Sequence, residues 1–269
     1  MASPDRTLRA GVELHTRRFL EGLIASGDLD RPSVGLLQEA LARAADAHPG
    51  AFVHLLADAL GAPPEAALEA GSLAQMFYAA ASLTDDLQDA DQADALARRD
   101  PRLQLNALAQ LLCATAARAA SLSRAVGDRG AVAALSATFQ AGVAMLTGQR
   151  LELAGGTWTS ARYRKVAELS AGRQFEAYLA MSALAAGASP ARLTGLGRPL
   201  GLLLQLHHDL RTRDRRVRGL SSRSIGTLRS AARRQLRAGL DRAPRAARRC
   251  LRSFAAPLLG GKAGLGRGS

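Results

Sequence analysis

Five aspartates lie within ten residues of the segment FYAAASLTDDLQDADQADALARRD: Asp85, Asp86, Asp89, Asp91 and Asp94. On a helix, Asp89 shares a face with both Asp85 and Asp86, because residues three and four apart are neighbours. Like charges at this spacing cost a helix about 0.2–0.5 kcal/mol per pair. A bound Mg²⁺ would turn this cost into a gain, since Mg²⁺ takes oxygen ligands and bridges carboxylates to a substrate phosphate.

Two interpretations of this acidic segment follow from the residues alone. A run of aspartates on a helix is commonly a solvated surface. Here residues 73–83, which precede the run, are nearly all apolar or small, so a helix of interior character ends in a group of carboxylates. This apolar lead-in favours a Mg²⁺ site over a solvated face.

The elements that would position the acidic segment are helices. Isoleucine and valine together number ten, and aromatic residues make up 4% of the chain, whereas Ala, Leu and Arg are abundant. Strands favour β-branched and aromatic residues, and the abundant residues favour helix, so we expect an all-α fold. Apolar periodicity and Gly or Pro breaks predict helices at residues 6–25, 33–46, 50–60, 64–97, 103–125, 129–154, 160–187, 190–214, 222–241 and 244–258.

These helices, joined by short connections, predict a single large helical bundle over residues 1–258 and a flexible tail over 259–269. Bundles place ligand and metal sites between facing helices. The two cysteines form no disulfide framework, and the N-terminus has no signal-peptide pattern, so we expect a cytoplasmic protein. No run of about 18 apolar residues is present, and we expect no transmembrane helix.

Residues 82–89, SLTDDLQD, resemble the first aspartate-rich motif, DDxxD, of trans-polyprenyl diphosphate synthases. On this basis the chain is identified as a member of the class I isoprenoid (polyprenyl) synthase superfamily. The resemblance implies an isoprenoid synthase bundle in which Asp85, Asp86 and Asp89 are the catalytic, metal-binding residues. They would bind Mg²⁺ ions that hold the diphosphate of an allylic prenyl substrate.

The same resemblance implies roles for four residues that flank the motif. An Arg pair often follows it in the family, and Arg98 and Arg99 stand about one helical turn later than that pattern expects. Ala80 and Ala81 occupy the positions that limit the depth of the prenyl pocket in the family. Both are small, which implies room for a long prenyl chain.

Three further segments match the family in the expected order. GQRLEL (residues 148–153) resembles its GQxxDL segment, YRKV (163–166) its YxxV helix, and GLLLQL (201–206) the lead into its second aspartate-rich motif. The resemblance runs from about residue 48 to 258 and implies that Gln149 and Gln205 contribute to substrate binding.

The second motif departs from DDxxD. Only Asp209 is kept in register, and His208 and Thr212 replace the other two aspartates. The stretch also resembles part of the metal triad of terpene cyclases, although the final Glu of that triad is Arg216 here. Asp209 and Thr212 are predicted to hold one Mg²⁺. The alternative for His207 and His208 is that they are ordinary polar residues of a helix.

The basic residues that bind a second substrate in chain-elongating relatives are missing. Residues 48–54, which match the isopentenyl diphosphate segment, contain no Lys or Arg. The Lys-Thr pair that helps to hold the allylic diphosphate aligns near Ser170 and Ala171, with Arg173 one turn away as a possible substitute. This selective loss favours a reaction of one allylic diphosphate, such as terpene cyclisation, over chain elongation.

The C-terminal quarter is strongly basic. Residues 198–269 contain 18 basic and three acidic residues, a net charge of +15. The net charge of the whole chain is +13, so the remainder is slightly acidic. Four interpretations remain open: a solvated face, contact of Arg215, Arg216 and Arg218 with the substrate diphosphate, peripheral attachment to an anionic membrane, and nucleic-acid binding. The last is ranked lowest because no aromatic platform or helix-turn-helix pattern accompanies the charge.

The sequence therefore predicts a Mg²⁺-dependent enzyme of the polyprenyl synthetase or terpene synthase kind, acting on an allylic prenyl diphosphate by prenyl transfer or cyclisation. One alternative is a non-catalytic relative that binds a prenyl diphosphate or serves as a partner subunit. Another is a basic helical membrane- or nucleic-acid-binding protein. A homodimer is expected from the resemblance, with a heteromer containing an active synthase as the alternative.

Overall fold

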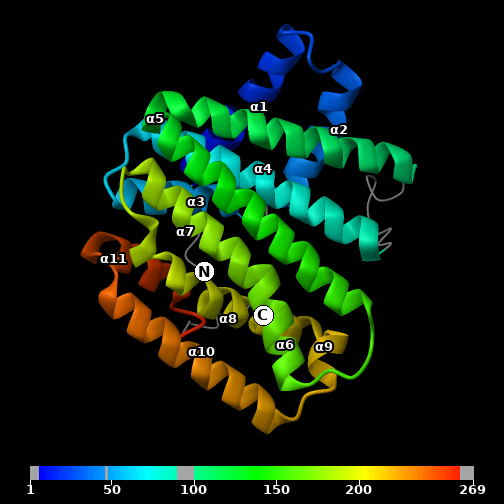
Figure 1. Cartoon of the computed structure of the whole chain (residues 1–269), viewed down its shortest axis with the longest axis vertical. Coiled ribbons are helices and arrows are strands. Elements are labelled where there is room, and N and C mark those ends of the chain that lie inside the picture. The colour runs from blue at the N-terminus through cyan, green and yellow to red at the C-terminus, as the bar shows by residue number, and fades with distance from the viewer. Residues whose placement is uncertain (1–5, 46–47, 90–99, 261–269) are drawn as a thin grey trace, which may run out of the picture. The chain divides into compact units, whose positions relative to one another are not determined.

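Every regular element of the computed structural model, which describes residues 6–45, 48–89 and 100–260, is a helix (Figure 1). The predicted all-α fold class is therefore confirmed. The α-helices are α1 (Arg6–Ala25), α2 (Arg31–Ala45), α3 (Pro49–Ala59), α4 (Pro64–Asp89), α5 (Pro101–Leu153), α6 (Ser160–Ala167), α7 (Arg173–Ala185), α8 (Gly197–Thr212), α9 (Arg215–Arg218), α10 (Ser222–Arg242) and α11 (Arg245–Ala255). A π-helical turn, η1 (Glu168–Gly172), joins α6 to α7, and two 3₁₀ turns, η2 (Pro190–Arg192) and η3 (Thr194–Leu196), precede α8.

Proline and glycine set most helix boundaries. Pro64 is the first residue of α4, in the first turn where its missing N–H is tolerated. Pro190 was expected to begin a long helix, but it begins the turn η2, and α8 starts only at Gly197. Gly127 interrupts α5 with φ 76° and ψ 161°, so the two helical parts of α5 meet at a kink, and Figure 1 shows α5 changing direction along its length. That interruption falls in the predicted gap between residues 125 and 129.

The chain forms two compact units. The N-terminal unit comprises Ser3–Ser136 and Met181–Ala188, and the C-terminal unit comprises Met1–Ala2, Ala137–Ala180 and Ser189–Ser269. The predicted domain over 1–258 thus contains two units, which are described separately below. Most of the predicted tail (259–269) lies outside the described residues.

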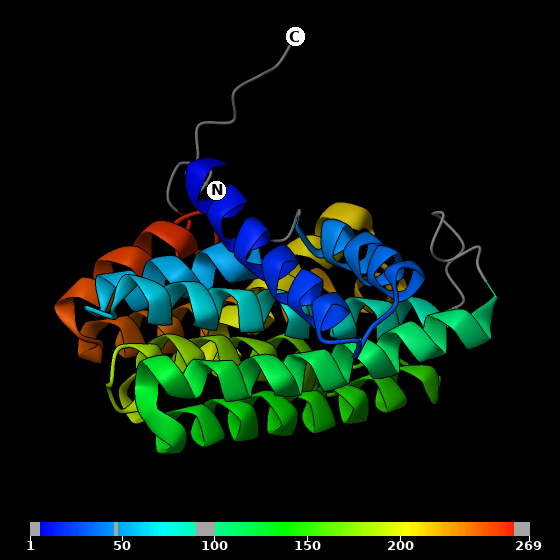
Figure 2. The ribbon, with the colours of Figure 1, turned by 90° about the horizontal axis from the view of Figure 1, so that it is seen from above.

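In the N-terminal unit, α4 is the central helix, and α1, α2 and α3 pack on it (Figure 2). The crossing of α3 and α4 is close because Gly50 and Gly71 lack side chains. A Cβ on Gly50 would lie 2.7 Å from the carbonyl oxygen of Gly71, which is too short for any real contact. Most buried side chains of α4 are small or apolar, so its acidic end continues from a packed core.

In the C-terminal unit, the turn η1 packs against α5 and α8 through glycines. A Cβ on Gly201 of α8 would lie 2.4 Å from the backbone of Ala171 and Gly172. A Cβ on Gly148 of α5 would lie 2.6 Å from the hydroxyl of Ser170. These two glycines begin the segments GQRLEL and GLLLQL, so close helix packing explains why glycine is needed in both.

Helix α5 is long and largely exposed. Of the described helices it alone is apolar and long enough to cross a membrane by length and composition, with a mean hydropathy of 1.4 over 18 residues, 22% of them buried. The sequence prediction, which required an unbroken run of about 18 apolar residues, did not identify this part of α5. A helix that packs its exposed apolar side chains against a second chain passes the same test, so length and composition do not assign α5 to a membrane.

Candidate functional site

The acidic segment forms the last turns of α4. Leu83 is buried in the core of the N-terminal unit, Asp86 is half-buried and Asp85 is exposed. Thr84 donates its hydroxyl hydrogen to the carbonyl oxygen of Ala80 at 2.8 Å, so its side chain is turned back along the helix. The last turn of α4 contains no basic residue. Carboxylates at a helix C-terminus oppose the macrodipole, so the position of these aspartates does not stabilise the helix.

The charge at this helix end acts on the neighbouring tyrosine. Burial raises the pKa of Tyr78 above its usual value, and the negative charges of Asp85 and Asp86 raise it further. The two carboxylates therefore create a negative potential at the edge of an apolar core. Their oxygens are the ligands that Mg²⁺ prefers, so the donor set fits the predicted metal.

The third aspartate of the motif, Asp89, is the last residue of α4, and its side chain lies outside the described part of the chain. Among the side chains that are described, no three of His, Cys, Asp or Glu are grouped to hold a metal ion. The roles of Asp85, Asp86 and Asp89 in metal binding stay predictions.

Asp209, on α8 of the C-terminal unit, has very different surroundings. Its side chain is 0% exposed. Tyr163 donates its hydroxyl hydrogen to Oδ2 of Asp209 at 2.7 Å, and Gln205 donates its amide hydrogen to Oδ1 at 2.8 Å. A third donor, Nη2 of Arg216, lies 2.9 Å from Oδ1. Both oxygens of the carboxylate are therefore occupied by protein donors.

Arg216 contacts three carboxylates at once. Its Nη1 lies 3.0 Å from Oε2 of Glu152, and its Nε lies 3.0 Å from Oδ1 of Asp214, in addition to the Asp209 contact. The side chain of Arg216 is only 18% exposed. This guanidinium joins the end of α5, the end of α8 and the start of α9. The set of Glu152, Tyr163, Asp209, Asp214 and Arg216 is called the Arg216 cluster below.

The electrostatics of the Arg216 cluster follow from burial and charge together. Burial alone would lower the pKa of Arg216, but Asp209, Glu152 and Asp214 raise it above the ordinary value. Burial raises the pKa of the Asp209 carboxyl, and Arg216 is the main influence that opposes the rise. Burial and then the charge of Asp209 raise the pKa of Tyr163, so this hydroxyl remains a donor.

The predicted Mg²⁺ site at Asp209 and Thr212 does not fit this arrangement. Thr212, the last residue of α8, has an exposed side chain whose hydroxyl donates to the backbone oxygen of His208 at 3.1 Å. Asp209 points into the unit, whereas Thr212 and His208 lie on its surface. His207 and His208 are both exposed, as expected for ordinary polar helix residues.

The other predicted substrate-binding residues are spread over both units. Ala80 is buried in the core cluster of the N-terminal unit, and Ala81 is half-buried. Gln149 is half-buried on α5, and Gln205 contacts Asp209. Arg98 and Arg99 lie outside the described residues.

Arg173 is engaged elsewhere. Its Nη1 forms an ion pair with Oε2 of Glu176 at 2.7 Å, and the second oxygen of Glu176 pairs with Arg198 at 3.0 Å. A diphosphate held by Arg173 would therefore share its guanidinium with Glu176.

The segment that matches the second-substrate site of elongating relatives is the start of α3. Residues 49–53 are buried, and Gly50 lies in the close crossing with α4. His54 is half-buried, and burial lowers its pKa. A buried apolar helix start supplies no cation for a second diphosphate.

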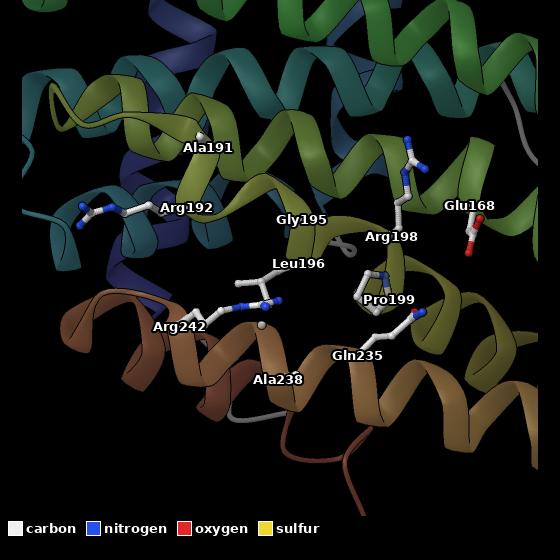
Figure 3. Close-up of a pocket in the computed structure, with 11 residues that line it drawn as sticks. Glu168, Ala191, Arg192, Gly195, Leu196, Arg198, Pro199, Gln235, Ala238 and Arg242 are labelled. Carbon is white, nitrogen blue, oxygen red and sulfur yellow. The ribbon is translucent and has the colours of Figure 1, made fainter.

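A surface cleft of about 690 Å³ lies in the C-terminal unit between α10 and the segment from η2 to α8 (Figure 3). Arg192, Arg198 and Arg242 line it, above a floor that includes Leu196 and Pro199. Figure 3 shows the guanidinium groups of Arg192 and Arg198 pointing in different directions. Because a diphosphate requires converging donors, the cleft is a basic surface without the geometry of a diphosphate site.

The basic helices beyond this cleft carry repelling charges. Burial lowers the pKa of Arg233, and its neighbours Arg229 and Arg237 lower it further. Among the described residues of α10 and α11, no large apolar side chain is exposed. Contact with an anionic membrane through these helices would therefore depend on charge rather than on insertion of apolar side chains.

Of the arginines expected near a diphosphate, Arg216 is used inside the protein. Arg215 is 65% exposed and lies 3.5 Å from Glu152, and Arg218 donates to the backbone oxygen of Arg213 at 2.7 Å. The contacts of Arg216 with Glu152, Asp209 and Asp214 were not predicted from the sequence. The available signal was the substitution of Arg216 for an expected metal-ligating Glu, which places a cation where the resembled pattern has a metal ligand.

Comparisons with known proteins support the fold. No protein-family model and no curated protein matches the chain. Among solved structures, an FPP/GFPP synthase from Zymomonas mobilis is 20% identical with a TM-score of 0.73, over 94% of this chain and 98% of that one. A geranyltransferase from Legionella pneumophila is 17% identical with a TM-score of 0.73, over 94% and 97%.

A heterotetrameric geranyl pyrophosphate synthase from mint is 16% identical with a TM-score of 0.69, over 95% of this chain and 99% of that one. At these identities the likeness establishes the fold. The chain has the all-α fold of class I isoprenoid synthases, the fold of trans-prenyltransferases, and the predicted fold type is confirmed.

Proposed function

We propose that this protein is a Mg²⁺-dependent enzyme that ionises an allylic prenyl diphosphate, for prenyl transfer or terpene cyclisation. The observation that carries the proposal is the pair Asp85 and Asp86 at the end of a core helix in an isoprenoid synthase fold. The like charges and the helix dipole both disfavour carboxylates at this position, and a bound cation would offset both effects.

Asp85, Asp86 and Asp89 would hold Mg²⁺, which stabilises negative charge on a departing diphosphate. The half-buried Asp86 is next to an apolar core that excludes water, and carboxylates in such surroundings hold a cation more strongly than on an open surface. We propose that the prenyl chain lies on the core side of the motif, beside the small side chains of Ala80 and Ala81. An apolar environment also protects a carbocation from water.

The reaction of a single allylic diphosphate is favoured over chain elongation. The start of α3 is buried and has no Lys or Arg between residues 48 and 54, which argues against a site for a second diphosphate there. Arg173, the substitute expected for the missing Lys-Thr pair, is paired with Glu176. We therefore propose that the protein binds a single diphosphate substrate, at the acidic end of α4.

The test is a diphosphate-release assay. The purified chain would be incubated with Mg²⁺ and geranyl, farnesyl or geranylgeranyl diphosphate, with and without isopentenyl diphosphate. We expect release without isopentenyl diphosphate, and loss of release on Asp85→Ala with Asp86→Ala. The matched control is Asp128→Ala, because Asp128 is an exposed acid of the same unit. Release that requires isopentenyl diphosphate would restore chain elongation, and turnover unchanged in the double variant would exclude the proposal.

A second candidate is a non-catalytic relative that binds a prenyl diphosphate or serves a catalytic partner as a subunit. The observation that favours it is the Arg216 cluster, in which a predicted metal ligand is fully engaged with protein groups. The mint protein of the same fold is heterotetrameric. No diphosphate release from the isolated chain, with release restored by a partner synthase, would support this candidate.

A homodimer in the cytoplasm is the proposed state of the protein. Its support is an apolar stripe on α5 formed by Phe139, Val143 and Leu146, all exposed and spaced four and three residues apart on one helix face. Such a stripe on a helix is typical of a protein interface. A monomer in light scattering, unchanged by Val143→Glu, would exclude this assembly. Nucleic acid is not a proposed partner.

A further inference from the structure

The carboxylates of the Arg216 cluster are arranged around a guanidinium instead of around a common point. Nη1 of Arg216 faces Glu152 at 3.0 Å, Nη2 faces Asp209 at 2.9 Å, and Asp214 lies along the other edge, 3.0 Å from Nε and 3.4 Å from Nη2. A planar guanidinium directs its donors outward along different edges. The three carboxylates are therefore distributed around the edges of the group.

A Mg²⁺ ion requires the opposite geometry. Its ligands converge in an octahedron at about 2.0–2.1 Å from the metal. The described acids form no such group, here or elsewhere in the described part of the chain. Oδ2 of Asp209, the oxygen that Arg216 does not contact, accepts the hydroxyl hydrogen of Tyr163 at 2.7 Å. Oδ1 already accepts from two donors and Oδ2 from one, and the side chain is fully buried, so a metal would have to displace protein donors to reach Asp209.

Charge supports the same conclusion. Asp209 is 0% exposed, and a buried carboxylate must be paired with a cation or lose its charge. Arg216 supplies that cation permanently, since a guanidinium does not release its proton in proteins. Three carboxylates raise the pKa of Arg216 further.

We propose that Arg216, in place of a metal ion, is the cation that neutralises the carboxylates of this cluster. The segment around Asp209 therefore binds no metal. The function of Arg216 is to fix the ends of α5 and α8 and the start of α9 through Glu152, Asp209 and Asp214. Arg216 is thus a positioning residue. The proposed metal site of this chain is then the acidic end of α4, and the segment around Asp209 adds none. The inference concerns metal content and stability, so it stands whether or not the chain turns over a substrate.

The first experiment counts bound metal. Mn²⁺ bound per chain would be measured by electron paramagnetic resonance on the full-length protein with inorganic diphosphate present. We expect the same number for wild type and Asp209→Asn. The matched control is Asp241→Asn, an acid of the same unit that is exposed and pairs with Arg252 at 2.9 Å. A loss of one Mn²⁺ in a folded Asp209→Asn protein, but not in Asp241→Asn, would overturn the inference.

The second experiment needs no metal binding. Melting temperatures would be measured in EDTA for variants of the two adjacent arginines. Arg216→Ala should lower the melting temperature by about 10 °C, because it leaves buried carboxylates unpaired. Arg216→Lys should recover part of this loss, since it keeps the charge but cannot face three acids. Arg215→Ala, whose side chain is 65% exposed, should shift melting by about 3 °C or less.

Each outcome separates this inference from the proposed enzyme function. If Arg216→Ala melts like wild type in EDTA, Arg216 is not the counterion of the cluster and the inference fails. If even wild type binds no Mn²⁺, the proposed Mg²⁺-dependent function fails, whereas a metal-free Arg216 cluster is supported.

Discussion

Helices α4 and α8 end at the two positions where the resemblance to prenyl synthases places aspartate-rich motifs, and the surroundings of their aspartates differ. At the end of α4, Asp85 is exposed, Asp86 is half-buried, and the last turn contains no basic residue. At the end of α8, Asp209 is fully buried and faces Arg216, Tyr163 and Gln205. The same residue type therefore occupies two electrostatic environments.

The difference shows what makes an aspartate available to a metal. A carboxylate at the edge of an apolar core, at a helix end where the macrodipole opposes its charge, gains from an added Mg²⁺. A carboxylate whose oxygens already accept protein hydrogen bonds would have to lose those bonds first. We therefore expect the aspartates of α4 to contribute to function and little to stability. We expect Asp209 to contribute to stability.

The largest expected effect is on activity at α4. Asp85→Asn combined with Asp86→Asn should reduce Mg²⁺-dependent diphosphate release at least ~100-fold, the equivalent of about 3 kcal/mol of lost transition-state stabilisation. The free energy of unfolding should rise by only about 0.5 kcal/mol, because the substitutions remove like-charge pairs from the helix. Diphosphate release and urea denaturation measure the two quantities. A large loss of stability would remove the contrast between the two helix ends.

The largest expected effect on stability is at α8. Asp209→Ala should lower the free energy of unfolding by about 3–5 kcal/mol, because it removes the buried partner of Arg216. Asp241→Ala breaks an exposed ion pair with Arg252 and should cost at most about 1 kcal/mol. Urea denaturation of both variants provides the comparison. Equal losses in the two variants would show that the buried ion pair of Asp209 stabilises the fold no more than the exposed pair of Asp241.

An intermediate effect is expected where α8 crosses η1. Gly201→Ala should cost about 1–3 kcal/mol of stability, since its Cβ would lie 2.4 Å from the backbone of Ala171 and Gly172. Gly226→Ala on α10 is the matched control, because nothing lies within 4 Å of its Cβ. That control should gain about 0.5–1 kcal/mol from helix propensity. Thermal or urea unfolding checks both, and a stabilising Gly201→Ala would contradict the close packing.

The smallest expected effects are on two tyrosines, one beside each acidic helix end. Burial and nearby aspartates raise the pKa of Tyr78 and of Tyr163. A group whose pKa is higher in the folded state stabilises the fold below its unfolded pKa, so this contribution is lost as the pH rises above about 10. Absorbance at 295 nm against pH measures the ionisation.

Substitutions separate the two tyrosines. Asp85→Asn with Asp86→Asn should lower the pKa of Tyr78 alone, and Asp209→Asn should lower that of Tyr163 alone. A shift of both tyrosines by one substitution would mean that the two acidic ends are not electrostatically independent.

Much of the fold could be predicted from composition and local pattern. The predicted helix at 6–25 coincides with α1, and that at 222–241 ends within one residue of α10, because proline, glycine and capping residues act locally. The short helix α9 and the π-helical turn η1 were missed. The turn η1 packs closely against Gly148 and Gly201, contacts that no local pattern announces.

The sequence by itself determined an all-α protein with an acidic run at the end of an apolar helix, and the resemblance of that run to a prenyl synthase motif. Both depend on composition and on spacings of three and four residues, which are fixed within one helix. Only the tertiary structure decided the role of Asp209, because its partner Tyr163 lies 46 residues away and Arg216 reaches Glu152 across 64 residues. Burial and pairing of charge depend on which helices meet, and that is a property of the packed chain.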